Sequence, residues 1–289
     1  MKVCLLGATG SIGSAVLRTL IGRGHEIVAL TRSYPSTTIL RQAGATVLRG
    51  DLGRPEDWVS RIAGVDAVVH MACDFDSPMA EIDRHLLDTL LPALARSGAK
   101  ARFVYTGGCW LFGPTGGTPA TEESRFAPLP AFAWMVPNLQ RVLASPEVDG
   151  LVVHPGMVHG SDGGVFRRFA RDAAEGRAVR VTGSEAVRWP LIHCDDLAEL
   201  YALVLERAAP GSSWLGVAND GVPVGRIARA IAGGKDPEVV SADTVAAELG
   251  EWARGYAMDQ CLSGAKARQQ LGWAPRHTDP ETDVLAFRP

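Results

Sequence analysis

Residues 3–13, VCLLGATGSIG, decide the fold of this 289-residue chain. The apolar run from Val3 is typical of a buried strand, and the segment after residue 11 has the apolar spacing of a helix. Between them Gly7 permits a tight turn, Gly10 lets a pyrophosphate approach the backbone, and Gly13 lets helix and strand pack closely. The free N–H groups of the helix N-terminus would face those phosphates. The residues predicted to bind a dinucleotide here are Gly7, Thr9, Gly10, Ser11, Ile12 and Gly13.

Apolar runs of strand length alternate with amphipathic segments of helix length through the first half of the chain. The predicted strands begin at Val3, Glu26, Ala45, Asp66, Ala101 and Gly150. The predicted helices cover residues 11–22, 82–96 and 195–207. Such alternation predicts an α/β fold in which right-handed crossovers join parallel strands. The strands are nearly continuous in Val, Leu and Ile, as in a Rossmann-like, doubly wound sheet that is covered on both faces.

The regular alternation of predicted strands and helices ends after residue 155, where Gly, Arg and Pro become more frequent and the strands shorten. We therefore expect two domains. A dinucleotide-binding Rossmann domain would take residues 1–155 and about 190–215. A smaller substrate-binding cap, mostly C-terminal, would take residues 156–189 and 216–289.

The composition argues against several classes of partner. The formal net charge is −3, so neither nucleic acid nor an acidic membrane surface is expected as a partner. No apolar run approaches the roughly 18 residues of a membrane helix, and the glycines from position 7 interrupt any secretory signal. The five cysteines are odd in number and form no CxxC pair. We therefore predict free thiols, no metal site and a cytoplasmic location.

The end of the second predicted strand, ALTRS at 29–33, bears on the choice of cofactor. NAD-specific sites place a carboxylate there to hold the ribose 2′-OH, and this chain has Thr31 followed by Arg32 and Ser33. An arginine with a neighbouring hydroxyl would bind a 2′-phosphate instead, which favours NADP over NAD. Asp51 and Leu52 follow the third strand. The carboxylate of Asp51 would hydrogen-bond the adenine amino group, or cap a helix.

Further motifs appear in order along the chain: HMA at 70–72, YTGG at 105–108, HPGMVHG at 154–160 and WPLIHCDDLA at 189–198. Together with the glycine turn, they resemble the extended short-chain dehydrogenase/reductase family, and more loosely its epimerase/dehydratase-like members. The resemblance runs from residue 1 to about 275. It implies a Rossmann-like sheet, a bound nicotinamide cofactor and a substrate pocket under a C-terminal cap. It also implies that Ala72, Pro155 and Val158 lie along the cofactor, toward the nicotinamide.

The chain departs from this family at the residues that transfer protons. The family has a Ser or Thr after the fifth strand, where this chain has Gly108. It also has a Tyr with a Lys four residues later, positions that fall here on Trp134 and Asn138. No Lys anywhere in the chain stands four residues after a Tyr, so the loss holds for any register. Asn138 could still hold a ribose hydroxyl, but it has no charge with which to lower the pKa of a neighbour.

Three other residues are candidates for proton handling: Tyr105, Thr106 and His159. Tyr105 could equally be a buried sheet residue, and His159 a packed histidine. A second group, Cys109, Trp110, Trp134 and Trp189, would line an aromatic pocket for a flat substrate, or else belong to the core. Gly107 and Gly108 would leave free space and exposed backbone N–H groups beside the nicotinamide.

These observations leave three functions open. The first is an NADP(H)-dependent oxidoreductase of atypical short-chain dehydrogenase type that reduces an activated enone, quinone-like or carbonyl small molecule without the Tyr–Lys pair. The second is a non-redox cyclase, isomerase or dehydratase on the same fold. The third is an NADP-binding sensor or interaction protein without turnover. A homodimer is left open, and neither the substrate nor the pathway follows from the sequence.

Overall fold

The computed structural model describes residues 1–74, 78–95, 100–160 and 163–285. The chain divides into two compact units. The first comprises residues 1–107, 134–153 and 198–214, and the second comprises residues 108–133, 154–197 and 215–289. No helix among the described residues is both long enough and apolar enough to cross a membrane.

A seven-stranded sheet forms the core of the first unit, in the order β11-β6-β5-β4-β1-β2-β3. Its pairings from β6 through to β3 are all parallel. The strands are β1 (Lys2–Leu6), β2 (Glu26–Thr31), β3 (Thr46–Arg49), β4 (Ala67–His70), β5 (Arg102–Thr106), β6 (Asp149–Pro155) and β11 (Ser212–Gly216). All six predicted strands are therefore confirmed, because runs of Val, Leu and Ile fit a sheet that is buried on both sides.

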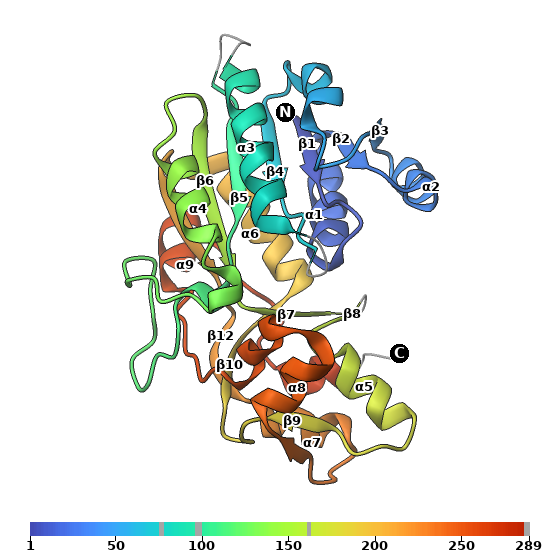
Figure 1. Ribbon diagram of the computed structural model, residues 1–289, viewed down its shortest axis with the longest axis vertical. Helices are drawn as coiled ribbons and strands as arrows, with labels where there is room; N and C mark the ends of the chain where they lie inside the picture. Colours follow the sequence, from blue (N-terminus) through green and yellow to red (C-terminus); the bar gives the residue numbers. More distant parts are fainter. Residues whose placement is uncertain (75–77, 96–99, 161–162, 286–289) are drawn as a thin grey trace. The chain divides into compact units, whose positions relative to one another are not determined.

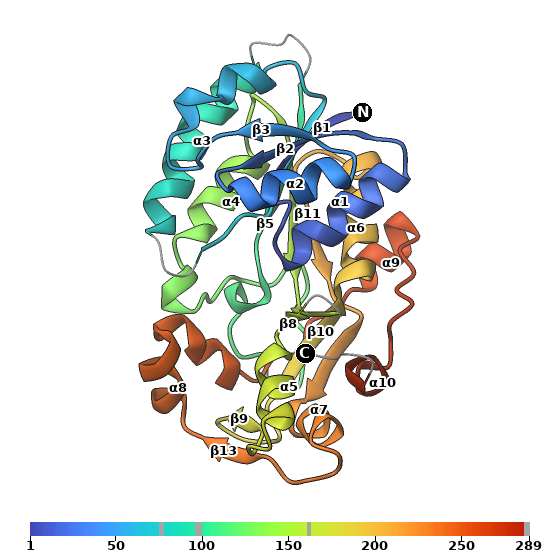
Figure 2. The same cartoon turned by 90° about the vertical axis from the view of Figure 1, so that its right-hand side faces the viewer.

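Helices cover both faces of this sheet, so the fold is the predicted Rossmann-like, doubly wound one. In Figures 1 and 2, α3 and α4 lie on one face, and α1 and α6 on the other. The helices are α1 (Ser11–Gly22), α2 (Tyr34–Gln42), α3 (Met79–Ala95), α4 (Met135–Leu143) and α6 (Cys194–Arg207), with short 3-10 turns η1 (Pro55–Asp57) and η2 (Val59–Ile62). Pro137 is the third residue of α4, in the first turn, where a missing N–H costs no hydrogen bond within the helix.

The second unit contains a four-stranded sheet in the order β12-β10-β7-β8 and a two-stranded sheet of β13 and β9. Its strands are β7 (Met157–Gly160), β8 (Gly163–Gly164), β9 (Arg180–Thr182), β10 (Arg188–His193), β12 (Asn219–Pro223) and β13 (Glu238–Val240). Its helices are α5 (Arg167–Ala174), α7 (Val224–Ile231), α8 (Ala242–Leu249), α9 (Ala265–Leu271) and α10 (Pro280–Leu285), with 3-10 turns η3 (Cys109–Leu111), η4 (Pro130–Phe132) and η5 (Glu251–Ala257).

The predicted assignment of one domain to the cofactor and one to the substrate stays a prediction. Residues 108–133, which it gave to the dinucleotide-binding domain, group with the second unit, as do residues 190–197. The sequence did not predict that residues 108–133 group with the second unit, because this segment has no helical or strand periodicity.

Candidate functional site

The glycine turn between β1 and α1 has the geometry that its sequence predicts. Gly7 has a φ of +90°, and a Cβ there would lie 2.8 Å from the backbone N of Ala72. A Cβ on Gly13 would lie 2.0 Å from the carbonyl oxygen of Gly7, so helix and strand could not approach as they do. Gly10 is different, because the nearest atom to its Cβ would be 3.5 Å away. A Cβ on Gly10 would therefore make only an ordinary van der Waals contact, and Gly10 lines the cavity described next, beside the first N–H groups of α1.

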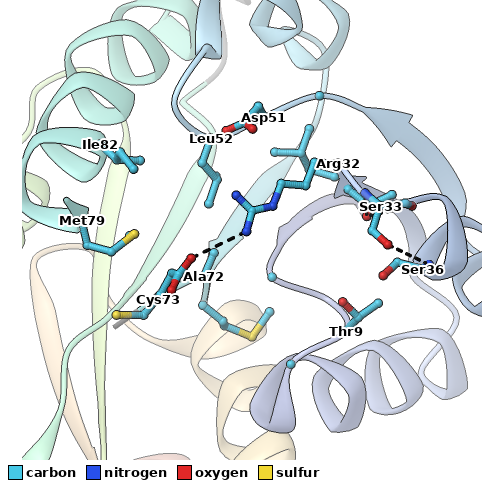
Figure 3. Close-up of a pocket in the computed structure, with 17 residues that line it drawn as sticks. Thr9, Arg32, Ser33, Ser36, Asp51, Leu52, Ala72, Cys73, Met79 and Ile82 are labelled. Carbon is cyan, nitrogen blue, oxygen red and sulfur yellow. Dashed lines mark hydrogen bonds and ion pairs between the residues drawn. The ribbon is translucent and has the colours of Figure 1, made fainter. Parts of the chain in front are cut away.

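A cavity of about 310 Å³ lies beside this turn. It is formed where β1, β2, β3 and β4 end, together with the start of α3 (Figure 3). Its lining residues are Gly7, Thr9, Gly10, Leu30, Thr31, Arg32, Ser33, Ser36, Gly50, Asp51, Leu52, Met71, Ala72, Cys73, Asp74, Met79 and Ile82. Eight of them were expected from the sequence as cofactor contacts: Gly7, Thr9, Gly10, Arg32, Ser33, Asp51, Leu52 and Ala72. The lining of this cavity does not include Ser11, Ile12, Gly13 or Asn138.

Polar groups near the end of β2 line one part of the cavity. Ser33 caps α2, and its Oγ accepts a hydrogen bond from the N–H of Ser36 at 3.4 Å. The guanidinium of Arg32 is exposed and forms an ion pair with Asp74, at 3.6 Å between Nη2 and Oδ2. Sequence analysis missed Ser36 and Asp74. The N-cap pattern of SYPS at 33–36 could have revealed the first, but only the sheet order brings the segment after β4 to this part of the cavity.

Asp51 makes a local turn at the cavity wall. Its Oδ1 accepts a hydrogen bond from the N–H of Gly53 at 2.8 Å, and its backbone carbonyl accepts one from the indole of Trp58 at 2.7 Å. The helix cap considered from the sequence is therefore wrong, because η1 begins only at Pro55. The contact of Asp51 with an adenine amino group stays a prediction.

A buried polar network lies beneath the ends of β4 and β5. The carboxylate of Asp83, on α3, accepts hydrogen bonds from Tyr105 Oη (2.7 Å) and Asn138 Nδ2 (2.7 Å), and its Oδ1 lies 2.6 Å from His70 Nε2. Burial opposes the ionisation of Asp83 most strongly, but these three hydrogen bonds outweigh it and leave the pKa of the carboxyl below its ordinary value. Burial and the nearby Asp83 raise the pKa of Tyr105 well above its ordinary value.

This network changes the roles expected for two residues. Tyr105 is 1% exposed and commits its hydroxyl to Asp83, which disfavours the proton-transfer role considered from the sequence. The amide of Asn138 donates to the same carboxylate and does not line the cavity, so the ribose contact expected of it is not supported. Neither contact was predictable, because Asp83 is one of several acids on α3 that sequence periodicity does not distinguish.

Thr106 and the two glycines after it lie at the end of β5. The hydroxyl of Thr106 is half-buried and lies 2.6 Å from the hydroxyl of Tyr201. The N–H of Gly107 donates to the carbonyl of Val153 at 2.8 Å, so the expectation that it is free is wrong. A Cβ on Gly108 would meet no atom within 4 Å, in agreement with the free space expected there.

The aromatic residues expected around a substrate belong to different units. In the second unit, Trp110 and Trp189 both contact Tyr256, with ring centroids 5.6 and 5.7 Å apart. Trp134 belongs to the first unit and precedes α4. The thiol of Cys109 is buried, which raises its pKa to about 12, so it is protonated at neutral pH. A single pocket made of all four predicted residues stays a prediction.

His159 lies on β7 of the second unit and is only 2% exposed. Its ring lies 5.4 Å from that of His193, which stacks on His277 at 3.7 Å. Burial, with a smaller contribution from those two histidines, lowers the pKa of His159 to about 3. At neutral pH it is therefore uncharged and a poor proton donor. Pro155 and Val158 lie in the same unit, and their expected position along a cofactor stays a prediction.

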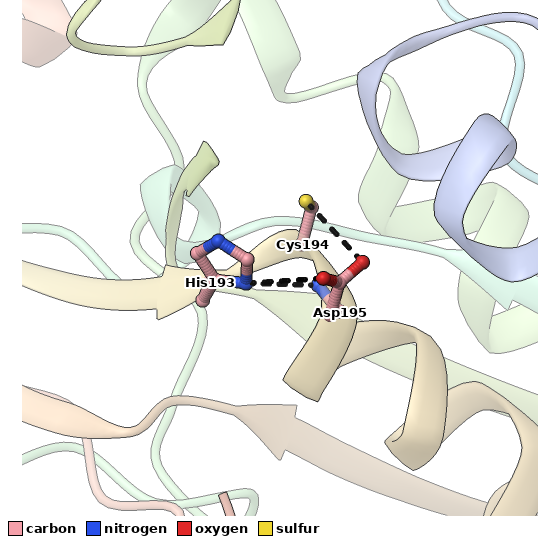
Figure 4. A group of neighbouring side chains, drawn as sticks. All are labelled: His193, Cys194 and Asp195. Carbon is pink, nitrogen blue, oxygen red and sulfur yellow. Dashed lines mark hydrogen bonds and ion pairs between the residues drawn. The ribbon is translucent and has the colours of Figure 1, made fainter. Parts of the chain in front are cut away.

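Among the described residues, one group of side chains has the proximity of a metal site: His193, Cys194 and Asp195 (Figure 4). These three residues are consecutive at the start of α6. The Nδ1 of His193 already accepts the N–H of Asp195 at 3.2 Å, and Cys194 Sγ lies 3.9 Å from Asp195 Oδ1. The lone pair of Nδ1 is thereby engaged by the backbone at the start of α6, and the absence of a metal site stays a prediction.

Comparisons with known proteins identify relatives of the whole chain. The NAD dependent epimerase/dehydratase family matches residues 3–215. A 2-alkyl-3-oxoalkanoate reductase of Stenotrophomonas maltophilia is 29% identical over 75% of this chain and 69% of its own length. A 3-diazoavenalumate denitrifying reductase of a Streptomyces species is 29% identical over 96% of this chain and 97% of its own.

Solved structures share the fold over nearly the full length. A human epimerase family protein in complex with NADPH has a TM-score of 0.74 and 20% identity, covering 98% of both chains. The UDP-glucose 4-epimerase of Thermus thermophilus in complex with NAD has a TM-score of 0.77 and 22% identity, covering 97% of this chain and 96% of that one. At these identities the similarity concerns the fold.

Proposed function

The chain belongs to the NAD dependent epimerase/dehydratase family, and from that premise we propose that it is an NADP(H)-dependent oxidoreductase that reduces an activated small molecule. The observation that carries this proposal is the cavity beside Gly10, which has an arginine and two serines where an NAD-specific site has a carboxylate. Two relatives that are named as reductases support the reaction class.

The residues around the cavity fit a dinucleotide. Gly10 lines the cavity, and the N–H groups that begin α1 have no partner within the helix, so together they suit a pyrophosphate. Arg32, Ser33 and Ser36 would bind the 2′-phosphate through a guanidinium and two hydroxyls. The carboxylate of Asp51 would accept a hydrogen bond from the adenine amino group, and Ala72 would form the cavity wall next to the glycine turn. When bound, the cofactor supplies a hydride for the reduction.

The absence of a Tyr–Lys pair supports one class of substrate over others. Without that pair, an electrophile whose new negative charge is already delocalised costs least to reduce, so enones, quinone-like compounds and activated carbonyls are the best candidates. Of the three predicted proton-handling residues, Tyr105 and His159 are buried, whereas Thr106 is only half-buried. We assign it the proton contact, with the Tyr201 hydroxyl holding its orientation at 2.6 Å.

The test has two stages. NADPH and NADH are titrated against the full chain by nicotinamide fluorescence, and Arg32→Gln should lower the affinity for NADPH about tenfold while leaving that for NADH unchanged. Oxidation of NADPH is then followed across a panel of enones, quinones and carbonyls. Thr106→Val should lower turnover at least about tenfold with unchanged NADPH affinity. Failure of both dinucleotides to bind would refute the proposal.

A second candidate is an NADP-binding protein without turnover. It is favoured by the combination of a well-formed cavity with the replacement of both Tyr and Lys by Trp134 and Asn138. Tight NADPH binding together with no oxidation across the whole panel would select this candidate over the reductase.

A further inference from the structure

The ion pair between Arg32 and Asp74 connects two separate parts of the cavity wall. Arg32 directly follows β2, and Asp74 stands four residues after β4, with β1 between these strands in the sheet. Both residues line the cavity. Figure 3 shows the Arg32 side chain extended from its strand toward the segment that contains Ala72 and Cys73, with a dashed line marking the ion pair.

The ion pair between Arg32 and Asp74 is weak enough for another anion to replace Asp74. Its atoms Nη2 and Oδ2 are 3.6 Å apart, which is beyond the range of a hydrogen bond, so the attraction is between charges only. The side chain of Arg32 is 71% exposed and that of Asp74 is 40% exposed. Exposed ion pairs of this kind contribute little to folding stability. Because the pair lies in the cavity, we expect it to affect binding there more than it affects folding stability.

We propose that Asp74 determines how strongly the protein prefers phosphorylated over unphosphorylated dinucleotides, by competing with the 2′-phosphate for the guanidinium of Arg32. This inference rests on the proposed function. When the adenosine ribose carries a 2′-OH, Arg32 stays paired with Asp74. When it carries a 2′-phosphate, the dianion and its three oxygens displace the carboxylate from Arg32. The chain thereby carries an internal competitor that weakens NADPH binding and leaves NADH binding as it is.

A second carboxylate in the same cavity provides a matched control. Asp51 also lines the cavity and carries the same charge, but its Oδ1 accepts the N–H of Gly53. No ion pair joins Asp51 to Arg32 among the described residues. If only the total charge of the cavity mattered, Asp51→Asn and Asp74→Asn would raise the ratio of NADPH to NADH affinity equally. If the pair matters, only Asp74→Asn raises that ratio, because loss of the adenine contact proposed for Asp51 would weaken NADPH and NADH alike.

The experiment uses the full chain and four variants: Asp74→Asn, Asp51→Asn, Arg32→Gln and the double variant Arg32→Gln/Asp74→Asn. Affinities for NADPH and NADH are measured by nicotinamide fluorescence. Those for 2′,5′-ADP and AMP, which isolate the adenosine end, are measured by calorimetry. Asp74→Asn should tighten binding of NADPH and 2′,5′-ADP about two- to fivefold and change that of NADH and AMP less than about 1.5-fold. In the Arg32→Gln background this gain should disappear.

Three results would overturn the inference: an unchanged NADPH-to-NADH ratio in Asp74→Asn, the same gain in Asp51→Asn, or the same gain with Arg32 removed. Circular dichroism checks that each variant is folded. If no dinucleotide binds to any folded variant, the proposed function fails as well. If the dinucleotides bind with the predicted pattern but NADPH is never oxidised, the inference on Asp74 stands and only the reductase activity is lost.

Discussion

Removing one hydroxyl group tests the buried network around Asp83. In Tyr105→Phe the ring remains packed edge-on against His70, at 5.6 Å between centroids, and only the hydrogen bond to Asp83 Oδ2 is lost. The carboxylate keeps its contacts with His70 and Asn138, so no partner is left unsatisfied. A hydrogen bond to a charged group contributes about 1.5–3 kcal/mol, so we expect a loss of about 2 kcal/mol in the free energy of unfolding.

The other buried tyrosine of the first unit is the matched control. Tyr201 is completely buried, and its hydroxyl pairs with Thr106, which is neutral. Tyr201→Phe should therefore cost only about 1 kcal/mol. In thermal unfolding the two losses correspond to about 4–8 °C and about 2–4 °C. Hydrogen exchange of peptides from β4 and β5 reports on the first unit separately, which matters because two units need not unfold together.

The dependence on pH separates the two variants further. In the folded protein the pKa of the Asp83 carboxyl is below its ordinary value. The ionised carboxylate therefore contributes fully to stability above the unfolded carboxyl pKa of about 3.9. This contribution is lost as the pH falls through the pKa of Asp83 in the folded protein. The cost of Tyr105→Phe should be constant from about pH 7 to 5 and should shrink below about pH 4. The cost of Tyr201→Phe should not change over that range. Equal costs for the two variants, or a cost of Tyr105→Phe that is independent of pH, would refute the reasoning.

Three further predictions concern the glycine turn, the buried His159 and the buried Asn138. Gly10→Ala should keep the melting temperature within about 2 °C but abolish NADPH binding. Gly13→Ala should lower the melting temperature by more than about 5 °C, because its Cβ would clash with backbone. Equal melting temperatures of the two variants would contradict this prediction. Burial lowers the pKa of His159 to about 3, so the folded protein binds fewer protons there than the unfolded chain, and stability is lost as the pH falls below about 6.5. His159→Phe should therefore lose less stability than the wild type between about pH 7.5 and 5, as urea unfolding would show. Asn138→Lys should be more stable than Asn138→Leu, because an ammonium group can pair with the buried Asp83 carboxylate. The opposite order of melting temperatures in thermal unfolding would count against the buried network around Asp83.

Much of the fold was predictable from the sequence, for a local reason. The six strands are runs of Val, Leu and Ile, and the turn at Gly7 needs a positive φ that only glycine adopts easily. Such features depend on neighbouring residues alone. The same holds for the meeting of eight of the predicted residues in one cavity, because residues at the carboxyl ends of parallel strands lie at one edge of the sheet. Their contact with a cofactor stays a prediction.

The candidate site was less predictable wherever the contacts are long-range. Tyr105 was a candidate for proton handling or for a buried sheet residue, and Asn138 for a ribose contact. Both donate to Asp83, a residue that the sequence did not single out. Asp74 reaches Arg32 only because the sheet order brings the end of β4 near that of β2. His159 appeared able to titrate near neutrality until its burial was known.

The amino-acid sequence by itself determined the Rossmann-like sheet, the glycine turn and the absence of a Tyr–Lys pair, since these depend on local conformational preference and on residue identity. The tertiary structure alone decided which polar groups face one another. Hydrogen bonds and burial act between residues far apart in the chain, and they control the ionisation of Asp83, Tyr105 and His159. For the same reason the Arg32–Asp74 pair, to which we assign an influence on cofactor preference by proposal, became visible only in the folded chain.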